Sequence, residues 1–133
     1  MKLMDALNRI QRAGDENSRA TAKLIEAAET VLKNLAVRTA KISPELTVTL
    51  NYGREYRLLG GTVWQQADAD PDSVIAWMAS LGAGQFEARA ELTRQEAYYF
   101  AADIAAGLLD KIVQVIQERV KNEGDAIDAL QNS

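Results

Sequence analysis

The sequence contains no histidine and no cysteine in 133 residues. These two side chains supply most nucleophile–base pairs, most transition-metal sites and most proton relays near neutral pH. Their absence removes the commonest catalytic designs, excludes a disulfide framework and fits a reducing compartment. The sequence also lacks an apolar leader and any run of about 18 apolar residues. We therefore expect a cytoplasmic protein that binds no membrane, no metal and no cofactor.

The composition is that of a folded globular chain, and the length predicts a single domain over residues 1–133. The net charge of −4 is unevenly distributed. Residues 1–41 hold eight Lys and Arg against five Asp and Glu, whereas residues 42–133 hold seven against fourteen. The uneven charge indicates solvated helix faces, or an acidic partner for the first part of this acidic chain, or a basic partner for the second part.

Apolar residues recur at helical spacing from about Lys2 to Thr39. Gly14 and the polar residues after it interrupt the apolar stripe, so this stretch forms either one helix or two. Ser43-Pro44 ends it, because a proline disfavours helical geometry in the residue before it.

A β-hairpin is predicted next. Residues 46–52 alternate strictly between apolar and polar, Gly53 supplies a turn, and residues 55–58 alternate in the same phase. The pair Gly60-Gly61 breaks the phase, which indicates a bulge or a tight bend. A lone hairpin is marginal in water, so it must lie against the helices or pair with another hairpin.

Two further helices are predicted. Asp70-Pro71 is a helix start, and the apolar residues after it indicate a short helix that Gly82-Ala83-Gly84 ends. Thr93 and Glu96 form a capping box that begins a long helix to about Asn122, with Gly124 breaking the chain. The predicted fold is therefore α+β and predominantly helical, with two long antiparallel helices, an inserted β-hairpin and one short helix.

The first half of the last helix is apolar nearly all round. This apolar surface is wider than one neighbouring helix can cover. Apolar surface left over in this way marks an interface, and a two-fold homodimer is its commonest form. We expect a homodimer or a larger homo-oligomer. Its predicted interface residues are Leu108, Ile112, Val115, Ile116 and Val120.

Acidic residues are the remaining candidates for chemistry. Asp68, Asp70 and Asp72 resemble the start of a calcium loop, but Ser73 replaces the required glycine and Ala79 the required glutamate. Glu96, Asp103 and Asp110 recur every seven residues, which we interpret as an exposed acidic stripe. Asp103 interrupts the most apolar stretch, so its burial would demand a partner such as an arginine or a tyrosine hydroxyl.

Nucleic acid is a second possible partner. Arg54 and Arg57 lie among the aromatic residues Tyr52 and Tyr56 of the hairpin, and a basic, aromatic β-ribbon can contact bases. The acidic balance of the chain argues against this, because phosphate binding needs a concentrated basic face.

No catalytic residues are assigned, and three functions follow in order of preference. The first is a non-enzymatic protein-interaction or assembly module, as in small accessory and structural proteins of bacteria and phages. The alternatives are a nucleic-acid-associated protein and a metal-binding hydrolase with an acidic site.

Overall fold

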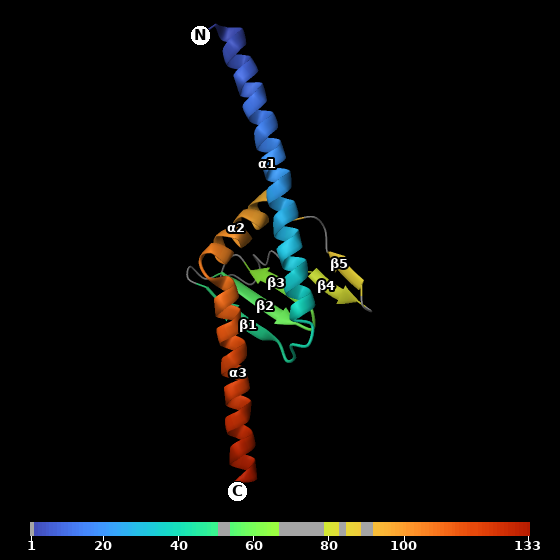
Figure 1. Ribbon diagram of the computed structural model, residues 1–133, viewed down its shortest axis with the longest axis vertical. Helices are drawn as coiled ribbons and strands as arrows, with labels where there is room; N and C mark the ends of the chain where they lie inside the picture. Colours follow the sequence, from blue (N-terminus) through green and yellow to red (C-terminus); the bar gives the residue numbers. More distant parts are fainter. Residues whose placement is uncertain (1, 51–53, 67–78, 83–84, 89–91) are drawn as a thin grey trace.

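The computed structural model describes residues 2–50, 54–66, 79–82, 85–88 and 92–133 (Figure 1). The chain is predominantly helical and adds one antiparallel sheet, which confirms the predicted fold class. In chain order the elements of the described part are α1 (Leu3–Arg38), β1 (Leu46–Thr49), β2 (Glu55–Leu59), β3 (Thr62–Gln66), β4 (Ala79–Gly82), β5 (Gln85–Ala88), α2 (Arg94–Ala105) and α3 (Leu108–Gln131).

The first helix is continuous, which settles the question of one helix or two. Gly14 lies inside α1, where a Cβ would project into open space, and the polar residues after it are exposed to solvent. Only the C-terminal half of α1 joins the core, through Ala28, Leu32 and Ala36. The N-terminal half projects away from the rest of the molecule (Figure 1).

The predicted hairpin is present, and the sheet extends beyond it. β1 and β2 pair antiparallel with Leu46 opposite Leu58, and β2 continues into β3 through the two-residue turn Gly60-Gly61. Both glycines have positive φ, +55° and +86°, so the glycine pair forms a tight turn of the kind that joins paired strands. The alternation places one side of the three strands in the core, with Leu46, Val48, Tyr56, Leu58 and Val63 fully or almost fully buried.

The short helix predicted from Asp70 falls largely on residues 67–78, outside the described part of the chain. Its predicted end is wrong, because residues 79–82 form β4, which pairs with β3 and with β5. Ala79 lies opposite Val63, and Leu81 lies opposite Phe86. The free edge of β3 offers unpaired backbone groups, and pairing with them outweighs the local helical pattern.

The predicted last helix is divided in two. Thr93 caps α2 and forms the expected capping box with Glu96, but α2 ends at Ala105. Gly107, with φ +97°, turns the chain before α3 begins at Leu108. Gly124 was expected to break the chain and instead lies within α3, which runs on to Gln131.

The two long helices do not lie side by side as expected. The turn at Gly107 leaves the short helix α2 beside α1 and carries α3 along β1, so that α1 and α3 extend toward opposite ends of the molecule (Figure 1). The core is formed where the C-terminal half of α1, α2 and the start of α3 meet the buried face of the sheet. Both helices therefore leave the core with one free end each.

The turn at Gly107 makes a testable prediction. Gly107→Ala should lower the free energy of unfolding by about 1–2 kcal/mol, because a Cβ is unfavourable at this positive φ although the space around it is open. Gly124→Ala is the matched control: it lies in a helix with ordinary φ and open space, and should stabilise the helix by up to about 1 kcal/mol. Urea denaturation measures both. Equal effects of the two substitutions would contradict the role of Gly107.

Candidate functional site

A buried polar network joins α2 to the sheet. The carboxylate of Asp103 is 1% exposed. Arg54 Nε donates to Asp103 Oδ1 at 2.7 Å, and the Tyr56 hydroxyl donates to Asp103 Oδ2 at 2.5 Å. Gln65 Nε2 then donates to the Tyr56 oxygen at 2.9 Å. The two kinds of partner expected for a buried Asp103, an arginine and a tyrosine hydroxyl, are thus both present.

The network is assembled from parts that are distant in sequence. Tyr56 and Gln65 lie opposite each other on β2 and β3, and Arg54 directly precedes β2. Asp103 comes from the last turn of α2. The Arg54 guanidinium also lies 5.2 Å from the centre of the Tyr99 ring, close enough for a cation–π contact. These contacts compensate the burial of Asp103 and hold α2 against the sheet.

Burial also keeps the Tyr56 hydroxyl in its protonated, donating form. Desolvation raises the pKa of Tyr56 well above its ordinary value, and the hydrogen bond to Asp103 raises it further. A phenolate beside a carboxylate in the core would place two like charges in a poorly solvated site. The phenol therefore serves as a permanent hydrogen-bond donor.

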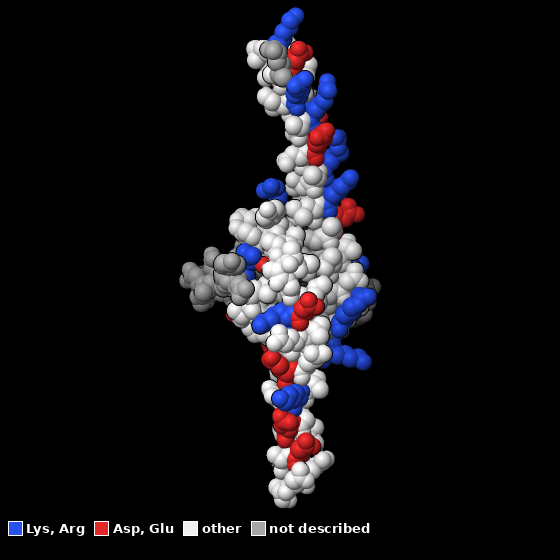
Figure 2. Space-filling view, turned by 60° about the vertical axis from the view of Figure 1, so that its left-hand side comes forward, with Lys and Arg blue, Asp and Glu red and all other residues white. Residues whose placement is uncertain are grey.

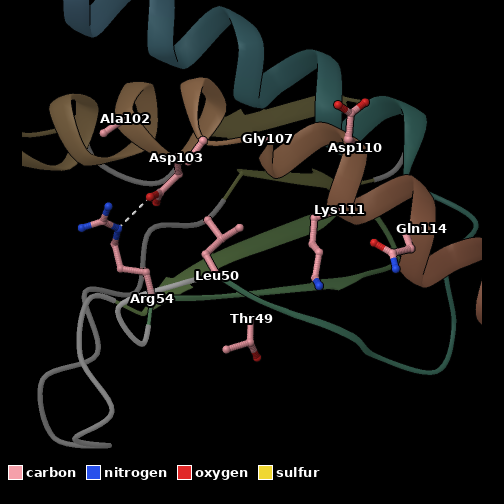
Figure 3. A pocket seen from close by; sticks show the side chains of 10 residues that line it. Thr49, Leu50, Arg54, Ala102, Asp103, Gly107, Asp110, Lys111 and Gln114 are labelled. Atoms are coloured by element: carbon pink, nitrogen blue, oxygen red, sulfur yellow. Dashed lines mark hydrogen bonds and ion pairs between the residues drawn. The ribbon is translucent and has the colours of Figure 1, made fainter.

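A cleft of about 560 Å³ opens beside the network, between the end of β1 and the junction of α2 with α3 (Figure 3). Arg54 and Asp103 reach its wall already bound to each other. Asp110, Lys111 and Gln114 of α3 also line it, and they combine charges of opposite sign with a neutral amide. Both Asp103 oxygens are engaged, so this carboxylate is not free to act as an acid, a base or a nucleophile.

Most of the residues predicted to contact nucleic acid make contacts within the protein instead. Tyr56 is completely buried and Arg54 is paired with Asp103, so neither is free to meet bases or phosphates. Arg57 lies on the other face of the sheet, 6.0 Å from the Trp64 ring and 3.9 Å from Glu45. Tyr52 lies outside the described residues. The alternation that buries Tyr56 and turns Arg57 outward separates the residues that the sequence had grouped.

Most of the predicted interface residues are buried or partly buried within the protomer. Leu108 and Ile112 belong to the protomer's own core, and Val115 and Ile116 are partly buried against it. Of the five, Val120 is open to solvent, at 65% exposed. The cause is the break at Gly107, which lays α3 along β1 and covers the face that a single long helix would have left free.

A different face of α3 carries the exposed apolar surface. We call it the α3 stripe, and it consists of Leu109, Val113, Val120, Ile127 and Leu130. With the partly buried Ile116 and the polar Glu123, these positions alternate in steps of four and three, as in helices that pair with another helix. The predicted interface shares Val120 and the partly buried Ile116 with this series and otherwise lies on the neighbouring face of α3.

A second apolar stripe runs along α1, and we call it the α1 stripe. Leu3, Leu7 and Ile10 are 46–74% exposed and follow the same four-and-three spacing. We call residues 2–23 the α1 arm. In this arm every residue is exposed apart from the half-buried Ala6 and Thr21. Charged side chains lie mainly along one edge of the arm, and the opposite edge is uncharged (Figure 2).

The acidic candidates do not form a joint site in the described part of the chain. Glu96 is buried in the capping box and Asp103 in the polar network, so the expected exposed stripe is wrong at both positions. Asp68, Asp70 and Asp72 lie outside the described residues. Elsewhere in the described ranges, no three carboxylates gather closely enough to hold a metal ion, and no helix is long and apolar enough to cross a membrane.

Comparison with protein families, with curated proteins and with solved structures finds no match to this chain.

The buried ion pair of Arg54 with Asp103 predicts that a small change at Asp103 strongly lowers stability. Asp103→Asn should lower the free energy of unfolding by about 2–4 kcal/mol, because Arg54 loses its counter-charge and an amide cannot accept from both Arg54 and Tyr56 equally well. Asp110→Asn, an exposed change of the same kind, should alter stability by less than about 0.5 kcal/mol. Urea denaturation compares them, and equal effects would show that the pair does not anchor α2.

Alkaline titration tests Tyr56. Because its pKa is raised in the folded state, the stabilisation is complete below the unfolded pKa of about 10 and is lost as the pH rises above it. Above pH 10 the stability of the native chain should therefore fall more steeply than that of Tyr56→Phe, by up to about 1.4 kcal/mol per pH unit. Denaturation at several alkaline pH values measures the slopes, and parallel curves would refute the expected difference.

Proposed function

We propose that this chain is a non-enzymatic assembly module that associates with further copies of itself through the exposed apolar stripes of α1 and α3. The observation that carries the proposal is the α3 stripe, five exposed aliphatic residues at coiled-coil spacing on a helix that leaves the core. Monomeric proteins rarely leave large apolar surfaces in water, and surfaces of this kind mark interaction sites.

The α1 arm supports the same function. It extends over about six helical turns, and nearly all its side chains are exposed. Most helical stability in proteins comes from tertiary packing, which the arm does not receive from the described part of its own chain, and Gly14 costs about 1 kcal/mol relative to alanine. An apolar partner along Leu3, Leu7 and Ile10 would supply the missing stabilisation.

The chemistry of the polar groups favours assembly over catalysis. Among the described residues Asp103 is the most deeply buried carboxylate, and both of its oxygens accept hydrogen bonds that hold α2 against the sheet. The polar network therefore supports a rigid body from which the two helices extend.

Mass measurement in solution tests the proposal. We expect the native chain to elute as a dimer or a larger closed oligomer in size-exclusion chromatography with light scattering. The double variant Val120→Asp/Ile127→Asp should raise the dissociation constant at least about 100-fold, because it removes roughly 3 kcal/mol of apolar burial. Both side chains are exposed in the protomer, so its fold and circular dichroism should be retained.

A matched control separates apolar contact from added charge. Gln117→Asp/Asn122→Asp adds the same two charges to exposed positions of α3 outside the stripe and should leave the mass unchanged. A monomeric native chain at high micromolar concentration would refute self-assembly. Equal dissociation of both double variants would show that the stripe is not the contact surface.

A further inference from the structure

We propose that assembly is heterotypic and reciprocal: the α1 stripe of one copy lies antiparallel against the α3 stripe of a second copy, and a two-fold axis repeats the contact. This inference rests on the proposed self-assembly and names its partner surfaces. It concerns residues 7–28 of α1 and residues 109–130 of α3, two stretches of equal length.

The α1 stripe and the α3 stripe cannot pack against each other within one chain. The free ends of α1 and α3 point toward opposite ends of the molecule (Figure 1). A second copy turned end over end places its α3 beside the α1 arm of the first, and reverses the direction of that helix. The two helices are then antiparallel, and the same rotation brings the remaining two stripes together at the other end.

Charge favours pairing between unlike helices. The α1 arm has five Lys and Arg against three Asp and Glu, a balance of +2. The free end of α3, residues 117–131, has two against four, a balance of −2. Pairing α1 with α1 or α3 with α3 would bring like net charges together, whereas pairing α1 with α3 brings opposite ones together.

The spacing of the apolar residues selects one register. In antiparallel helices the steps of three and four must coincide along both partners. Placing Ile10 opposite Ile127 satisfies this and also sets Leu7 opposite Leu130 and Leu24 opposite Val113. In the same register Glu123 faces Gly14. The polar residue that interrupts the α3 stripe therefore lies opposite the glycine at which the α1 stripe is interrupted. A shift by one heptad either way leaves Leu130 unpaired or sets it against Gly14.

An apolar groove lies where this register ends. It is formed between α1 and α2 and is lined almost wholly by carbon, from Leu24, Ala27, Ala28, Val31, Phe100, Ala101 and Ile104. The register sets Ala28 opposite Leu109 of the second copy, and Leu109 is 43% exposed in the protomer. The groove thus receives the last apolar side chain of the α3 stripe. This arrangement of two copies buries Leu7, Ile10 and Leu24 of α1, four residues of the α3 stripe and the groove, whereas Val120 faces Asn17 and Leu3 lies beyond the end of the partner helix.

Disulfide trapping tests the arrangement, and the absence of natural cysteine makes every cross-link attributable. In the double variant Ile10→Cys/Ile127→Cys, mild oxidation should yield a covalent dimer. Mass spectrometry of its peptides should show a disulfide between position 10 of one chain and position 127 of the other. Cysteine Cα atoms must approach within about 7 Å to bond, so the register is tested together with the pairing.

The control variant moves one of the two cysteines to another position on the same helix. Asn8→Cys/Ile127→Cys moves one thiol to the charged side of the α1 arm and should give at least tenfold less of the linked dimer under the same conditions. Disulfides joining position 10 to position 10, or 127 to 127, would overturn heterotypic pairing while leaving self-assembly intact. A monomeric mass before oxidation, with no cross-link afterwards, would refute both the arrangement and the proposed function.

Discussion

The bond between Arg54 and Asp103 is the contact on which the remaining architecture depends. A carboxylate at the last turn of α2 is buried against the sheet, and only an arginine and a tyrosine hydroxyl make that burial tolerable. Their contact sets the position of α2, which in turn offers α1 its apolar neighbour. Because Gly107 follows four residues later, the direction in which α3 leaves the core is set at the same point.

The free helices are a consequence of that geometry. With the turn at Gly107, α2 lies beside α1 and the start of α3 lies along β1. Each long helix therefore keeps an apolar stripe that its own chain cannot reach, and burial of those stripes requires a second molecule.

Local signals in the sequence predicted local structure well. The alternation of residues 46–49 and 55–58 predicted the hairpin, and Thr93 with Glu96 predicted the start of α2. The apolar surroundings of Asp103 predicted the kinds of partner that it has. The end predicted for the short helix was wrong, because residues 79–82 form β4 and pair with β3, and such pairing depends on a strand that is distant in sequence.

The sequence by itself determined the class of fold, the elements with strong periodicity and the surplus of apolar helix surface. Only the tertiary structure decided which apolar residues are surplus: Leu108 and Ile112 turn inward, whereas Leu109 and Val113 stay exposed. These four are neighbours on one helix and alike in hydrophobicity, so composition and spacing cannot separate them. The direction of α3 separates them, and that direction depends on a positive φ at Gly107 and on an ion pair between residues almost fifty positions apart.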